Sequence, residues 1–125
     1  MVSNIKKLAQ LRALARLRQD IELAKLARLT AEDQRIADQQ SDLRRAAHAV
    51  RHEAPLSALE ARLQDRFGDW TERRLDRLQA NRSALQPVIA AQKDQAARAV
   101  GREDVLGRLG DQLAQDLRLT QHRRS

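Results

Sequence analysis

The helical pattern of this chain is interrupted once, at the nine residues His52-Glu53-Ala54-Pro55-Leu56-Ser57-Ala58-Leu59-Glu60. Pro55 restricts the residue before it to extended conformations, so a helix is not expected to pass through this point. Directly afterwards, Ser57 and Glu60 have the spacing of a capping box. In such a box the Ser57 hydroxyl accepts the Glu60 amide hydrogen, and the Glu60 side chain reaches back. One helix is therefore expected to end here and another to begin.

Long helices are favoured on both sides of this corner, because no Gly precedes Gly68 and no Pro precedes Pro55. Pro87 is expected to kink the second helix, since it removes one backbone hydrogen bond. A short corner between long helices produces an antiparallel pair. We therefore predict an all-α fold, with two long helices forming an antiparallel coiled-coil hairpin as a single domain. The expected bounds are helix 1 over about 2–53, corner 54–56, helix 2 over about 57–118 and a disordered basic tail 119–125.

The composition agrees with this prediction and excludes several other classes of protein. Phe67 and Trp70 are the only aromatic residues, whereas 33% of the 125 residues are charged, which is typical of long helices rather than of a globular core. The chain contains no cysteine, so disulfides and thiolate metal sites are excluded. No apolar run approaches the roughly 20 residues that a membrane span requires. We expect a cytoplasmic protein without a secretory signal.

Apolar residues at heptad spacing predict the seam between the helices. Leu29, Ile36, Leu43 and Val50 repeat every seven residues, while Asp33 and Gln40 dilute the seam. In the second helix Leu78, Leu85, Ala99, Leu106 and Leu113 share one register, and Leu75, Ile89, Ala96 and Leu117 supply the other. With the corner near residue 55, the numbers of facing residues should add to about 110. The C-terminal end should then overhang by roughly ten residues, given the short loops of helical bundles.

The first segment, residues 5–21, departs from this pattern. At about 100° per residue, Ile5, Leu8, Leu11, Leu14, Leu17 and Ile21 cover most of the helix circumference. One facing helix can cover a narrow stripe but not this segment. We therefore predict a docking end where the termini meet, covered either by a different protein or by a third helix from self-association.

No motif in the sequence predicts catalysis. His48 and His52 lie four residues apart, but no Glu stands between them as in zinc hydrolases, so we interpret them as solvated side chains near a turn. Phosphate-binding loops, nucleophile elbows and candidate triads are missing from the pattern, and we expect neither an enzyme nor a cofactor.

The net charge of +7 indicates an acidic partner, which nucleic acid, an anionic membrane or an acidic protein surface could each provide. Acidic residues are interleaved with the Arg-rich stretches, as in the segment 69–77, which favours an ordinary charged helix face over nucleic-acid binding. Phe67 and Trp70 share a face near the corner. They could pack against the first helix near residues 40–43 or form a binding hot spot at the closed end.

Four features of the chain define its layout: the helix from Ile5 to Val50, the corner at Pro55, the return helix through Leu75, Leu85 and Leu106, and the segment 99–106. Together they resemble the FliJ/YscO family of type III (flagellar) export stalk proteins. This resemblance spans most of the chain and lies in the layout rather than in a local motif. It implies a stalk or adaptor that binds the hexameric export ATPase, the export gate protein and export chaperones, peripheral to the inner-membrane export machinery.

Two sets of residues are expected to bind partners. The open-end set contains Ile5, Leu8, Leu11, Arg12, Leu14, Leu17, Leu113, Leu117 and Arg118; the closed-end set contains Phe67, Trp70, Arg73 and Arg74. The alternative functions are a basic coiled coil that binds nucleic acid and a self-assembling structural coiled coil.

Overall fold

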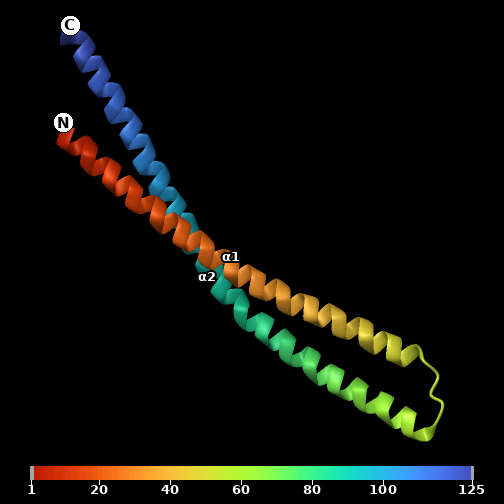
Figure 1. Cartoon of the computed structure of the whole chain (residues 1–125). Helices are drawn as coiled ribbons and strands as arrows, with labels where there is room; N and C mark the ends of the chain where they lie inside the picture. The colour runs from red at the N-terminus through yellow and green to blue at the C-terminus, as the bar shows by residue number, and fades with distance from the viewer. Residues whose placement is uncertain (1, 125) are drawn as a thin grey trace. The chain divides into compact units, whose positions relative to one another are not determined.

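The computed structural model describes residues 2–124 and consists of two long helices (Figure 1). Helix α1 spans Val2–His52 and helix α2 spans Ala58–Arg124. The two helices pack against each other, and no strand occurs among the described residues, so the predicted all-α helical hairpin is confirmed. Neither described helix has a stretch that is both long and apolar enough to cross a membrane.

The corner between the helices, residues 53–57, contains the predicted capping box with one difference. The Glu60 amide donates to the Ser57 hydroxyl at 3.1 Å, as expected. The Glu60 carboxylate reaches back to the amide of Leu56, at 3.2 Å, rather than to that of Ser57. Both bonds satisfy amide groups that lack helical partners at the start of α2, and they fix where the helix begins.

The prediction of a disordered tail at 119–125 is wrong for the described part of that segment, because α2 continues to Arg124. Neither Gly nor Pro follows Gly110, so nothing in the sequence breaks the helix. The hydroxyl of Thr120 donates to the backbone carbonyl of Asp116 at 2.9 Å. The basic residues that suggested a tail, Arg123 and Arg124, lie in the last turn, where positive charge opposes the negative end of the helix dipole.

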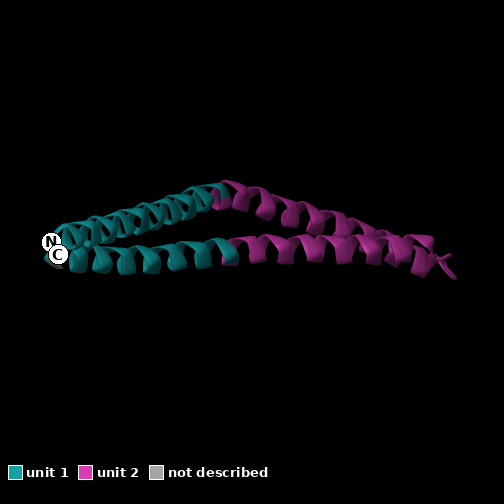
Figure 2. Cartoon of the chain, turned by 90° about the horizontal axis from the view of Figure 1, so that it is seen from above, with its two compact units in different colours: residues 1–27, 90–125 teal, residues 28–89 magenta. Residues whose placement is uncertain are grey.

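The contacts in the chain divide it into two compact units, each containing part of both helices (Figure 2). Unit 1 comprises residues 1–27 and 90–125, and unit 2 comprises residues 28–89. In unit 2 the side chains of Ile36, Ala47 and Leu78 are buried; in unit 1 Ala96 and Ala99 are buried. Ile36, Leu78, Ala96 and Ala99 belong to the predicted heptad positions, and Ala47 lies between two of them.

The register between the helices differs from the predicted one. The residue numbers of facing residues were expected to add to about 110. They add to 115 for the ion pair of Arg12 with Glu103 and for that of Asp33 with Arg82. The cause lies at the corner, where the Gln64 side chain donates to the backbone carbonyl of Glu53 at 3.1 Å. Because Gln64, six residues after the start of α2, lies beside the end of α1, the first turns of α2 have no facing residues from α1.

Candidate partner-binding site

The seam of unit 1 is unusually polar on its α1 side. Arg12 and Arg16 both donate to one carboxylate oxygen of Glu103, at 3.0 and 3.2 Å. The hydrogen bonds from Arg12 and then Arg16 lower the pKa of Glu103 below its ordinary value of 4.5. Arg12, which the sequence placed in the partner-binding set, is therefore engaged within the hairpin.

A second polar layer of unit 1 surrounds Glu22, which is buried. Its carboxylate accepts a hydrogen bond from the Gln92 side chain at 2.6 Å and forms ion pairs with Arg18 and Lys25 at 2.9 and 3.7 Å. The hydrogen bond from Gln92 is the largest cause that lowers the pKa of Glu22. These partners offset the desolvation of the carboxylate, so the layer acts as structure rather than as a reactive site.

The leucines of the same segment lie on a different side of α1. Leu11, Leu14, Leu17 and Ile21 are each more than half exposed, and Leu14 reaches 62%. Leu14, Leu17 and Ile21 each follow a seam residue by two positions, which places them about 200° from the seam around the helix. The expectation that one facing helix leaves part of this segment uncovered agrees with these exposures. We call Leu11, Leu14, Leu17 and Ile21 the outer stripe.

The structure thus divides the predicted open-end residues between two faces. Ile5, Leu8, Arg12, Leu113 and Leu117 are half-buried at seam positions, whereas Leu11, Leu14, Leu17 and Arg118 are exposed. Contact across the seam is direct at Leu8, whose side chain lies 3.9 Å from the position that a Cβ would occupy on Gly110. Only the exposed members remain available to a partner of the intact hairpin.

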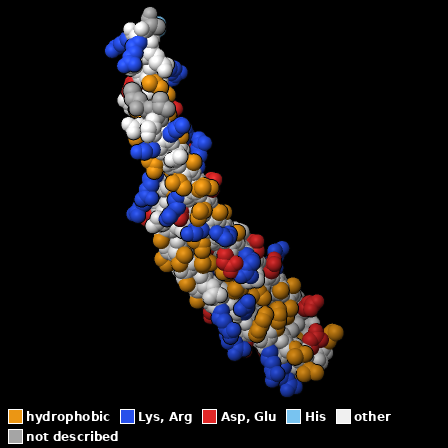
Figure 3. Space-filling model, turned by 60° about the vertical axis from the view of Figure 1, so that its left-hand side comes forward, with side chains coloured by type: hydrophobic (Ala, Val, Ile, Leu, Met, Phe, Trp, Pro, Cys, Tyr) orange, Lys and Arg blue, Asp and Glu red, His pale blue; other side chains and the backbone are white. Residues whose placement is uncertain are grey.

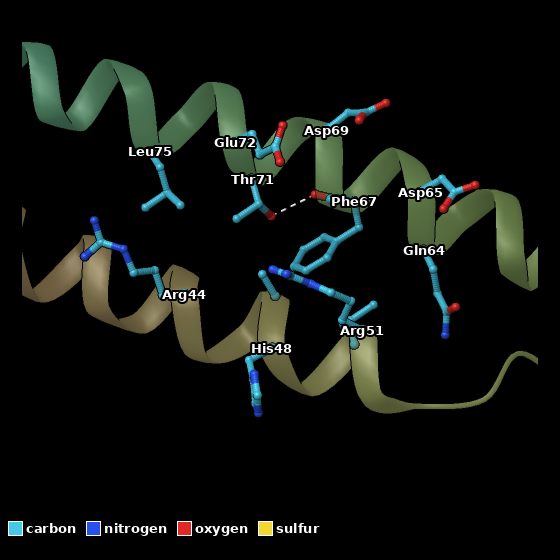
Figure 4. A pocket seen from close by; sticks show the side chains of 13 residues that line it. Arg44, His48, Arg51, Gln64, Asp65, Phe67, Asp69, Thr71, Glu72 and Leu75 are labelled. Atoms are coloured by element: carbon cyan, nitrogen blue, oxygen red, sulfur yellow. Dashed lines mark hydrogen bonds between the residues drawn. The ribbon is translucent and has the colours of Figure 1, made fainter.

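The closed end of the hairpin, in unit 2, carries the predicted aromatic pair. The rings of Phe67 and Trp70 stack with centroids 6.1 Å apart and planes inclined by 25°. Trp70 is half-exposed, while Phe67 is half-buried and points from α2 toward α1 (Figure 4). The expected packing near residues 40–43 is wrong by about two turns, because the altered register brings Phe67 to a groove lined by Ala47, Val50 and Arg51.

This groove has a volume of about 930 Å³, and small residues at two positions leave space between the helices. Gly68 has no atom within 4 Å of the position of an added Cβ, and Ala47 lies on the facing helix. Thr71 uses its hydroxyl to donate to the backbone carbonyl of Phe67 at 2.7 Å. Arg44 and Arg51 line the α1 side and Asp65 and Glu72 the α2 side, so the groove has walls of opposite charge.

Other apolar residues at the closed end were not among the predicted site residues. Leu56, Leu59 and Leu63 are 91%, 63% and 56% exposed and precede the aromatic pair at helical spacing. Leu59 and Leu63 could have been found from the sequence only with the correct register, since the predicted pairing gave them facing residues on the first helix. Of the predicted basic pair, Arg73 is exposed and Arg74 is half-buried.

The two histidines lie side by side near the end of α1. His52 and His48 have ring centroids 4.0 Å apart, and Nδ1 of His52 lies 2.9 Å from the backbone carbonyl oxygen of His48. Among the residues that the structure describes, no group of three or more His, Cys, Asp or Glu could hold a metal ion.

Hydrophobic side chains on the face drawn in Figure 3 occur in patches among Lys and Arg side chains. Comparison of the chain with family models, with curated proteins and with solved structures returned no match.

Proposed function

We propose that this chain is a stalk or adaptor protein of a type III protein export apparatus, which binds a hexameric export ATPase through unit 1. The observation that supports the proposal is the outer stripe, where four large apolar side chains remain exposed on a helix whose other face is already occupied by α2. Contiguous exposed apolar surface is typical of a protein-binding site. The layout of the hairpin resembles the FliJ/YscO stalk proteins, whose role this proposal assigns to the chain.

The closed end provides a second surface in this proposal, facing the export gate protein. Trp70 is the kind of large, half-exposed aromatic residue that anchors binding hot spots, and Leu59 and Leu63 extend the apolar area along α2. In this role the chain would work in the cytoplasm, beside the membrane-bound export machinery, and export chaperones would be further partners.

ATP hydrolysis by a purified export ATPase tests the proposal directly. Addition of the purified chain should raise the hydrolysis rate and promote formation of the hexamer. The double variant Leu14→Asp with Leu17→Asp should lose this effect while keeping its helical content by circular dichroism, because both residues are exposed. Val88→Asp is a matched control, since Val88 is 48% exposed and lies in unit 2.

An unchanged hydrolysis rate and unchanged oligomeric state of the ATPase on mixing would remove the export proposal. Stimulation that survives in the Leu14 and Leu17 double variant would retain the class of function but reject the outer stripe as the site.

A further inference from the structure

The outer stripe has the geometry of a second coiled-coil seam. Leu14, Leu17 and Ile21 of the stripe are followed by the exposed Ala24. These four residues are separated by three, four and three positions, which is the spacing that presents a continuous row to one facing helix. Leu11, three residues before Leu14, widens the row by one side chain. The stripe is therefore about three turns long and one helix wide.

In the segment that carries the outer stripe, the residues of α1 that face α2 are more polar than the residues of the stripe. Between residues 11 and 24, Arg12, Gln19 and Glu22 occupy half-buried or buried seam positions, whereas the side chains of the outer stripe are exposed. A segment that only packed against α2 would have the opposite arrangement, because burial of apolar surface is the main favourable term in helix packing. The distribution indicates that a further helix covers the outer stripe.

The charge of the surroundings indicates what kind of helix this is. Unit 1 contains 13 Lys and Arg against 7 Asp and Glu, a net charge of +6, while unit 2 contains 11 against 10. Lys7, Arg18 and Lys25 lie along one side of the outer stripe, and the exposed Asp20 lies along the other. Arg18 and Lys25 share the single carboxylate of Glu22. Positive charge therefore remains on the face that carries the exposed leucines.

We propose that the outer stripe receives an amphipathic helix of another protein whose apolar row is flanked by Asp and Glu. This inference rests on the proposed partner-binding role of unit 1 and specifies the chemistry of the partner. A second copy of the chain fits less well, because two units of +6 would repel each other at the interface. A lipid surface also fits less well, since the row is narrow and the first 28 residues contain no Trp, Tyr or Phe to anchor at a membrane.

The test uses two synthetic coiled-coil peptides as probes, both with Leu and Ile at the seam positions. The acidic peptide has Glu at both flanking positions, and the basic peptide has Lys there. Fluorescence anisotropy of each labelled peptide with the intact chain should detect binding of the acidic peptide only. Its affinity should fall as salt rises from 50 to 300 mM, because flanking ion pairs at the surface are screened, with a Debye length of about 10 Å at 0.1 M.

The double variant Leu14→Ala with Leu17→Ala should weaken binding of the acidic peptide about tenfold or more, because two apolar contacts are removed from the centre of the row. Val88→Ala is the matched control and should leave the affinity unchanged. Circular dichroism of each variant confirms that the hairpin remains folded.

Several results would overturn the inference. These are equal binding of the acidic and basic peptides, unchanged affinity in the double variant, or a stripe-dependent dimer of the chain in sedimentation. Stripe-dependent binding to vesicles of phosphatidylglycerol and phosphatidylcholine without peptide binding would do the same. Peptide binding without stimulation of the export ATPase would reject the proposed function and retain this inference. Stimulation of the ATPase without peptide binding would retain the proposed function and reject this inference.

Discussion

At the residue scale, the most informative side chain is Gln40, a polar residue that is only 1% exposed in the seam of unit 2. Its amide donates to Gln79 at 3.2 Å, and its oxygen accepts from Arg82 at 3.0 Å. Arg82 also donates to Asp33 through two nitrogens, at 3.1 and 3.4 Å. Asp33 and Gln40, which the heptad pattern predicts to dilute the seam, therefore belong to one connected polar network, of the kind that specifies register in coiled coils.

We expect Gln40→Ala to lower the free energy of unfolding by about 1–3 kcal/mol, because it removes the two hydrogen bonds that connect Gln40 to Gln79 and Arg82 within the seam. Urea unfolding followed by circular dichroism measures this change. Gln95→Ala, which changes an exposed Gln of α2, should stay within about 0.5 kcal/mol of the parent. Equal effects of the two substitutions would show that the network contributes nothing to stability.

At the scale of the element, the start of α2 depends on local bonds more than on packing. Its first turns have no facing residues from α1, and Leu59 and Leu63 are exposed there. The capping box formed by Ser57 and Glu60 is thus the main interaction that holds this end of the helix. The other end of α2 needs no cap of this kind because its basic residues favour the helix C-terminus.

Removal of the cap by Ser57→Ala should cost about 1 kcal/mol of stability, the usual effect of losing an N-cap hydroxyl. Hydrogen exchange should show the loss as faster exchange of amides near residues 58–62, with little change at the centre of α2. Ser41→Ala removes an exposed hydroxyl inside α1 and should not reproduce the effect. Unaltered protection near 58–62 would mean that the box is dispensable.

At the scale of the whole molecule, carboxylates in unit 1 connect α1 to α2. The pKa of Glu22 and that of Glu103 are both lowered from 4.5 in the folded chain, by a hydrogen bond from Gln92 and by hydrogen bonds from Arg12 and Arg16 respectively. A lowered pKa means that the folded state favours the ionised form. The resulting stabilisation is fully present above pH 4.5 and is lost as the pH falls through the lowered values.

The melting temperature of the chain should therefore fall as the pH decreases below about 4.5. Glu103→Gln should lower the melting temperature at pH 7 and make it less dependent on pH, because it removes one of the carboxylates whose pKa is lowered. Glu72→Gln, which alters an exposed carboxylate of unit 2, should leave the pH dependence of melting almost as it was. A parent and a Glu103→Gln variant with parallel pH profiles would contradict the assignment.

Local sequence determined the two helices, the corner between them and the seam positions, because the effects of Pro55, the Ser57 box and heptad spacing all act within a few turns. It also indicated that residues 5–21 are too apolar for one facing helix to cover. The end of α2 was missed because a cluster of basic residues resembles a tail in composition, yet suits a helix C-terminus physically.

Only the tertiary structure decided the register, and with it the surface that each residue occupies. The sum of facing residue numbers depends on how far α2 starts beyond α1, which follows from the path of residues 53–57 and the bond between Gln64 and Glu53. That path placed Phe67 opposite Ala47, exposed Leu59 and Leu63, and paired Arg12 with Glu103. Such contacts join residues up to 91 positions apart, so no local pattern encodes them.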